Sequence, residues 1–93
     1  MSISADVLDR AWRKVGLSVQ DRGVDRWAYL IVNGRRVVAT RRSRGSGKLP
    51  GMIPHLIRQQ MKLNEEQFQD LVDCPLSRED YLRILREKGL LDG

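Results

Sequence analysis

The stretch RRSRGSGKLPG, residues 41–51, combines four cationic side chains with three glycines and could therefore bind phosphate. A nucleotide-binding P-loop requires the pattern G-x-x-x-x-G-K-[ST]. With Gly47 and Lys48 as its G-K pair, the first glycine would fall at Arg42 and the Mg²⁺-binding hydroxyl at Leu49. Both requirements fail, which argues against a nucleotide site. Two interpretations remain: a loop that contacts a polyanion, and a solvated connector.

Charge is distributed unevenly along the 93 residues. Residues 26–64 hold nine cations and no acid, residues 65–93 hold four cations and eight acids, and residues 1–25 balance to zero. Intermixed signs are the simpler route to solubility, so an acid-free stretch of this length needs another explanation. It is the electrostatic pattern expected of a protein that binds nucleic acid.

Cations on both sides of residue 40 are the candidate nucleic-acid contacts. Guanidinium and ammonium groups bind phosphate oxygens, and the glycines of the stretch let a backbone approach closely. Because side chains alternate along a strand, two adjacent arginines point to opposite faces, and at most one of them shares the surface of the loop. The candidates are Arg35, Arg36, Arg41, Arg42, Arg44 and Lys48.

Three further side chains have open roles. His55 is the only histidine. It follows Pro54 at the start of an expected helix, and no partner lies nearby in the sequence, so a structural role comes ahead of a phosphate contact or catalysis. Trp27 and Tyr29 share one face of an expected strand. Core packing is their simplest role, and a platform for stacking bases is the alternative.

A hairpin is the clearest structural signal. Residues 26–32 and 35–40 are rich in β-branched and aromatic residues, and the Asn33-Gly34 pair between them favours a type I′ turn. Residues 17–23 are expected to form a connector. A third strand at or just before residues 41–48 has only weak support.

Apolar periodicity predicts four helices around this hairpin. Ser4, Asn64 with Gln67, and Ser77 are suitable caps for the first, third and fourth, and Pro54 suits the first turn of the second. The expected fold class is α+β, with a small antiparallel sheet packed on helices as in double-stranded-RNA-binding domains. We expect two C-terminal helices to follow that core.

The chain is expected to be one domain, 1–93, with a core over 1–64 and an acidic helical extension over 65–93. The extension either completes the hydrophobic core, or it docks a basic partner or covers the basic face of the protein. A lone Cys74 excludes an internal disulfide and a Cys-based zinc site, so no cofactor or metal is expected. The absence of a signal peptide and of a membrane-length apolar run predicts a cytoplasmic protein with no membrane partner.

Residues 5–68 resemble the HicA family of bacterial toxins, small ribonucleases with a double-stranded-RNA-binding-like fold. The matching segments are RKVGL (13–17), VNGRRVVAT (32–40) and SGKLPGMIPHLIRQQMKLNEEQF (46–68). The family carries its catalytic histidine in a Gly-Ser-His-like step, which reads Gly23-Val24-Asp25 here. A carboxylate with a pKa of about 4 is a poor general acid at neutral pH and repels phosphate.

The resemblance therefore implies an RNA-binding surface. For cleavage, the candidate catalytic residues are Asp25, at the position of the family's histidine, and His55, the only histidine of the chain. The first expectation is a small basic protein that binds RNA through the face formed by residues 35–48. One alternative is an active ribonuclease toxin of a toxin–antitoxin system. The other is a protein-interaction module that binds an acidic partner such as an antitoxin.

Overall fold

The computed structural model describes residues 3–45, 47–73 and 75–91. Its three strands form one antiparallel sheet in the order β1-β2-β3. One helix precedes the strands and three follow them, so the predicted α+β class is confirmed. The elements are α1 (Ala5–Lys14), β1 (Ser18–Arg22), β2 (Asp25–Val32), β3 (Arg35–Ser43), α2 (Ile53–Gln60), α3 (Glu65–Val72) and α4 (Arg78–Glu87).

The hairpin forms at the predicted turn. Asn33 and Gly34 have φ angles of 52° and 78°, and positive φ at both positions is what a type I′ turn requires. The returning strand β3 continues three residues past the predicted end, to Ser43. The third strand of the sheet is β1, so the predicted connector over residues 17–23 is wrong. The sequence of β1, SVQDR, lacks the apolar alternation that marks a half-buried strand, and most of the strand is exposed.

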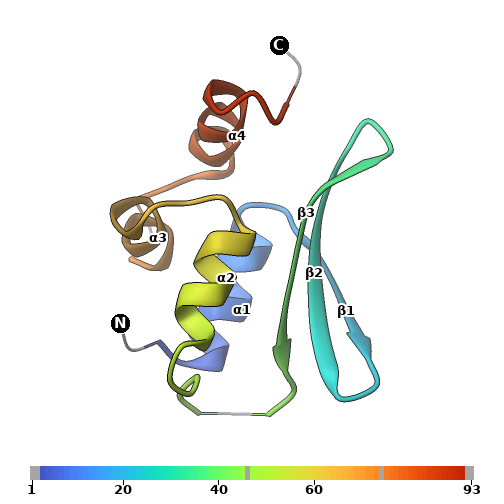
Figure 1. Cartoon of the computed structure of the whole chain (residues 1–93), viewed down its shortest axis with the longest axis vertical. Coiled ribbons are helices and arrows are strands. Elements are labelled where there is room, and N and C mark those ends of the chain that lie inside the picture. The colour runs from blue at the N-terminus through green and yellow to red at the C-terminus, as the bar shows by residue number, and fades with distance from the viewer. Residues whose placement is uncertain (1–2, 46, 74, 92–93) are drawn as a thin grey trace.

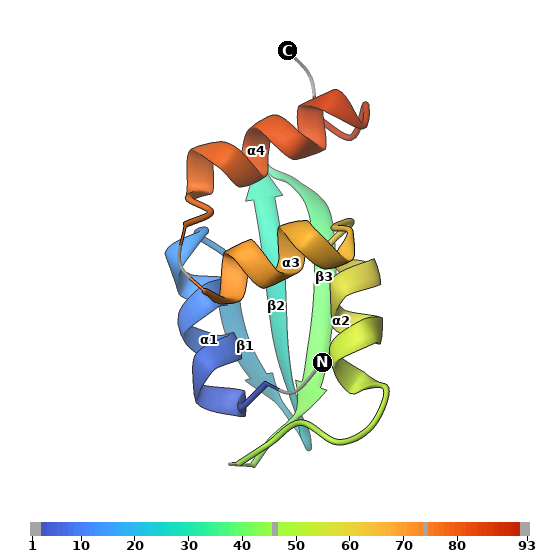
Figure 2. The same ribbon diagram turned by 90° about the vertical axis from the view of Figure 1, so that its left-hand side faces the viewer.

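The helices all lie on one side of the sheet. Figure 1 shows the sheet nearly edge-on with the helices to its left, and Figure 2 shows α3 crossing in front of α1 and α2. Helix α4 packs at the end of the molecule near the β2–β3 turn (Figure 1). No helix of the described residues covers the opposite side of the sheet, which we call the outer face.

One hydrophobic core joins the sheet to all four helices. Leu30 and Val38 contribute from the sheet, and Trp12 from α1 is fully buried between it and the later helices. The two acidic helices complete this core rather than cover the basic surface. The acid-free stretch before residue 65 and the acidic helices after it therefore contribute to one core and belong to one domain. The buried residues of that C-terminal part are Phe68, Leu71, Leu76, Tyr81, Ile84 and Leu85.

Side chains from α1 and α4 fasten the C-terminal helices to the core. The Lys14 ammonium donates to the Leu71 carbonyl at 2.7 Å, at the end of α3. The Arg78 guanidinium donates to the Val15 carbonyl at 2.8 Å, at the end of α1. Gly16 allows this approach, because a side chain there would collide with that guanidinium and its φ is +81°.

Candidate nucleic-acid interface

Two aromatic side chains of β2 lie on the outer face. The ring centroids of Trp27 and Tyr29 are 5.8 Å apart and the rings are within 9° of parallel, which is an offset stack. Alternation along β2 places Ala28 and Leu30 on the core side and these two rings on the other. Tyr29 is only 5% exposed, yet both rings lie outside the main hydrophobic cluster. The predicted burial is therefore confirmed for Tyr29, whereas Trp27 is half-buried and neither ring joins the main cluster.

Guanidinium groups cover these rings. Arg41 lies over Trp27 at 5.2 Å from the ring centroid, and Arg36 lies over Tyr29 at 4.9 Å. Arg22 also donates from Nη1 to the Tyr29 hydroxyl at 3.1 Å. These arginines explain why Tyr29 is buried on a face that no described helix covers. We call Trp27, Tyr29, Arg36 and Arg41 the arginine–aromatic ladder.

A β-bulge brings the two ladder arginines to the same face. Arg36 and Arg41 are five positions apart, so a regular strand would point them to opposite sides. The register of β2 and β3 shifts after Leu30, which pairs with Val38. The next residue of β2 pairs with Arg36, so Val37 is an extra residue in β3. The bulge thereby turns Arg36 to the outer face.

Arg35 lies away from the ladder, as the alternation of adjacent arginines predicted for one of the pair. It is exposed and lines a small cavity with Val32 and with Leu90 and Leu91 from the C-terminal segment. Arg35 is therefore not part of the surface formed by the ladder.

Arg42 is a predicted nucleic-acid contact, but the structure places it in the interior. Its side chain is 3% exposed and its Nε and Nη2 donate to the Asp9 carboxylate at 3.0 and 2.8 Å. Its Nη1 donates to the carbonyls of Ser43 and Gly45 at 2.8 and 3.2 Å. On the core side of β3, Arg42 joins the sheet to α1 and orders the start of the loop between β3 and α2, which we call the basic loop. Arg42 is therefore not available to phosphate.

Asp9 is the centre of a charged network under the sheet. It also accepts from Arg26 Nη1 at 2.7 Å, and Arg26 Nε donates to Asp21 at 2.6 Å. Burial alone would raise the pKa of Asp9, but hydrogen bonds and charge from Arg42 and Arg26 outweigh it and hold this pKa below its usual value. The hydrogen bonds that Arg26 donates to Asp21 and Asp9 raise the pKa of its guanidinium. Two cations of the acid-free stretch are therefore neutralised within the protein.

Arg44 and Lys48 remain exposed at the end of the sheet where the basic loop lies. The backbone N–H of Arg44 donates to the Val24 carbonyl at 2.8 Å, which closes the loop against the β1–β2 turn. Next to Lys48, the Gly47 carbonyl accepts from the N–H of Ala5 at 2.8 Å, so the loop is also anchored to the start of α1. Both cations are thus held on anchored backbone.

The two catalytic candidates lie in different places. Asp25 begins β2, and its Oδ2 is 3.3 Å from Arg41 Nη1. Asp25 lines a cleft of about 250 Å³ between the end of β3 and α2. Among the described residues that line this cleft, His55 is absent. His55 Nδ1 instead lies 3.4 Å from Arg58 Nη2 on the same helix.

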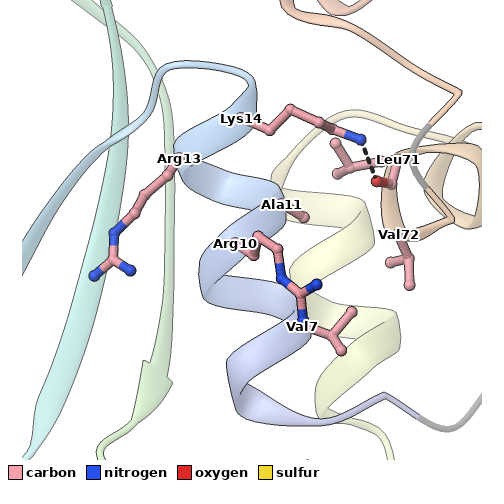
Figure 3. Close-up of a pocket in the computed structure, with 7 residues that line it drawn as sticks. All are labelled: Val7, Arg10, Ala11, Arg13, Lys14, Leu71 and Val72. Carbon is pink, nitrogen blue, oxygen red and sulfur yellow. Dashed lines mark hydrogen bonds between the residues drawn. The ribbon is translucent and has the colours of Figure 1, made fainter.

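A larger groove, of about 470 Å³, lies between α1 and α3 on the helical side (Figure 3). Lys14 reaches across it to the Leu71 carbonyl, whereas the Arg13 guanidinium extends to the other side of α1 (Figure 3). Its floor is mostly apolar and it lies on the opposite side of the sheet from the ladder, so it does not belong to the interface. The lining residues are Val7, Arg10, Ala11, Arg13, Lys14, Leu71 and Val72.

Comparisons with protein-family models, with curated proteins and with solved structures find no match for this chain. The resemblance to HicA toxins therefore stays a prediction. Within the described ranges, no helix combines the length and apolar character needed to cross a membrane. The same part of the chain has no group of three or more His, Cys, Asp or Glu side chains that could hold a metal ion.

Proposed function

We propose that this protein is a cytoplasmic RNA-binding module, related to HicA-type toxins, that binds single-stranded RNA on the outer face of its sheet. The observation that carries the proposal is the arginine–aromatic ladder on a face that no helix of the described residues covers. Unpaired bases stack on aromatic rings and on guanidinium planes, and guanidinium N–H groups also bind phosphate.

The ladder offers two stacking positions. A guanidinium over an aromatic ring can present its free side to a base, so that ring, guanidinium and base form three layers. Arg41 with Trp27 is one such pair and Arg36 with Tyr29 is the other. A duplex hides the faces of its bases, so this arrangement favours a single strand.

Exposed cations around the ladder supply the attraction for phosphate. Arg22, Arg36 and Arg41 lie on the outer face, and Arg44 and Lys48 lie at its end, whereas the paired Arg42 is buried. If about four phosphates are neutralised, the logarithm of the affinity should fall with the logarithm of salt concentration at a slope of roughly −3 for a single strand.

The positions of the acid and base candidates favour binding over cleavage. General acid–base catalysis needs a group within hydrogen-bond reach of the proton it transfers. Asp25 is paired with Arg41, and His55 is outside the cleft that Asp25 lines. The ribonuclease alternative therefore lacks a pair of groups assembled at one place.

Exchange of arginine for lysine tests the ladder, because lysine keeps the charge but has no planar group to stack. The double variant Arg36→Lys with Arg41→Lys should bind a fluorescent twelve-nucleotide uridine strand about ten-fold to a hundred-fold more weakly, measured by anisotropy. Its salt slope should match that of the wild type, since the number of charges is unchanged.

The matched control is Arg83→Lys with Arg86→Lys, which makes the same exchange on exposed positions of α4. This control should bind as tightly as the wild type. Equal affinities for the ladder variant and the control would contradict stacking on the ladder. Incubation of the wild type with total RNA, followed by electrophoresis, should show retention of RNA without fragments, and rapid degradation would instead support the ribonuclease alternative.

A further inference from the structure

The Asp25 carboxylate lies beside the arginine–aromatic ladder, paired with Arg41. Asp25 borders the cleft between β3 and α2, together with Arg41, which also belongs to the ladder. We propose that this cleft is a base-recognition subsite that prefers guanine, an inference that rests on the proposed binding of single-stranded RNA. A strand stacked on the ladder reaches the cleft directly, because Arg41 borders both.

The walls of the cleft suit a flat, partly apolar ligand. Ile53 and Leu56 line it from α2, and Leu56 is 48% exposed, so its side chain is accessible to a ligand. The guanidinium of Arg41 borders the same cleft. A base has apolar faces and a polar edge, so it can contact the aliphatic side chains with a face while its edge meets the polar groups.

Those polar groups form a defined set of acceptors and donors. The Asp25 side chain is 25% exposed and accepts one hydrogen bond, from Arg41 Nη1 at 3.3 Å, so most of its lone pairs are left for a ligand. Gln60 Oε1 accepts from the Thr40 hydroxyl at 2.7 Å, which orients the amide and leaves its NH₂ group to donate. The cleft therefore offers a carboxylate acceptor beside guanidinium and amide donors.

Guanine matches this set best among the four bases. Its N1–H and N2–H₂ groups are adjacent donors that pair with the two oxygens of one carboxylate, and its O6 and N7 accept from guanidinium or amide donors. Uracil has a single ring N–H flanked by two carbonyl oxygens, and a carboxylate repels those oxygens. Adenine and cytosine have one amino group next to an unprotonated ring nitrogen, which the second carboxylate oxygen also repels.

Inosine provides an atomic test, because it lacks only the N2 amino group of guanosine. We would compare uridine strands that carry one central guanosine, inosine or adenosine, with an all-uridine strand as the reference. The wild type should bind the guanosine strand about ten-fold more tightly than the inosine strand, since one hydrogen bond to a charged group is lost. Asp25→Asn should reduce this preference to less than two-fold, without weakening the binding of the all-uridine strand.

Asp70→Asn is the matched control, because it removes one negative charge from an exposed position on α3. It should keep the guanosine preference. Equal binding of guanosine and inosine strands by the wild type would overturn the inference, as would a preference that survives Asp25→Asn. If the all-uridine strand binds but no base is preferred, only the guanine subsite fails. If no strand binds at low salt, the proposed function and this inference fail together.

Discussion

The pair formed by Asp9 and Arg42 allows a quantitative prediction about stability. Their side chains are 8% and 3% exposed, and they share two hydrogen bonds of 3.0 and 2.8 Å. Asp9→Asn keeps the shape of the side chain but leaves the Arg42 guanidinium buried without a counter-charge. Breaking a buried pair in this way costs about 3–5 kcal/mol. The retained amide oxygen can still accept one hydrogen bond, so we expect a loss near the lower limit, about 3 kcal/mol.

A double-mutant cycle separates the pair from general damage to the core. Methionine at position 42 replaces the buried guanidinium with an apolar side chain of similar length, so it removes the charge that Asp9→Asn leaves unpaired. The double variant Asp9→Asn with Arg42→Met should therefore be about 1–2 kcal/mol more stable than Asp9→Asn alone. Asp6→Asn, an exposed change on the same helix, should stay within about 0.5 kcal/mol of the wild type.

Urea denaturation followed by far-ultraviolet circular dichroism provides the measurement. A domain of this size has roughly 5–14 kcal/mol of stability, so Asp9→Asn should still fold and show a lower midpoint with an unchanged slope. A loss below about 1 kcal/mol in Asp9→Asn would refute the reasoning, since it would mean that water or a rearrangement solvates Arg42. Additive effects in the double variant would refute it as well, because independent sites do not couple.

Two more predictions concern stability. The folded protein holds the pKa of Asp9 below its ordinary value of 3.8, so this stabilisation is complete above that pH and is lost as the pH falls through the lower folded value. Melting temperatures measured from neutral pH downward should drop most steeply below about pH 4, and Asp9→Asn should show a flatter profile. Tyr81 donates its hydroxyl to the Met61 carbonyl at 2.9 Å in the core. Tyr81→Phe should therefore cost about 1–3 kcal/mol in urea denaturation, and a neutral result would mean that the carbonyl finds another donor.

Local chemistry was enough to predict the hairpin and the helix starts. Asn33 and Gly34 adopt the left-handed conformations that their types favour, and Asn64 and Ser77 form capping boxes with the residues three positions later. Each of these features depends on a few neighbouring residues. Strand β1 was missed because its main stabilisation is pairing with β2, and SVQDR carries little apolar alternation of its own.

The composition of the interface was harder to predict, for two reasons. The bulge at Val37 changes the face of Arg36 relative to Arg41, and such a shift depends on the pairing of two strands. Arg42 was assigned to the surface with its neighbours, although alternation from Arg41 would have placed it on the core side. An acid at position 9, next to the buried Leu8, was the available signal that the core contains a partner for a cation.

The placement of the two tryptophans gives the protein separate optical reporters. Trp12 is fully buried in the core, whereas Trp27 lies on the outer face under the guanidinium of Arg41. Intrinsic fluorescence of a Trp27→Phe variant would therefore follow unfolding alone. The difference between that signal and the wild-type signal would follow events on the ladder, so one unlabelled sample could separate loss of fold from occupancy of the surface.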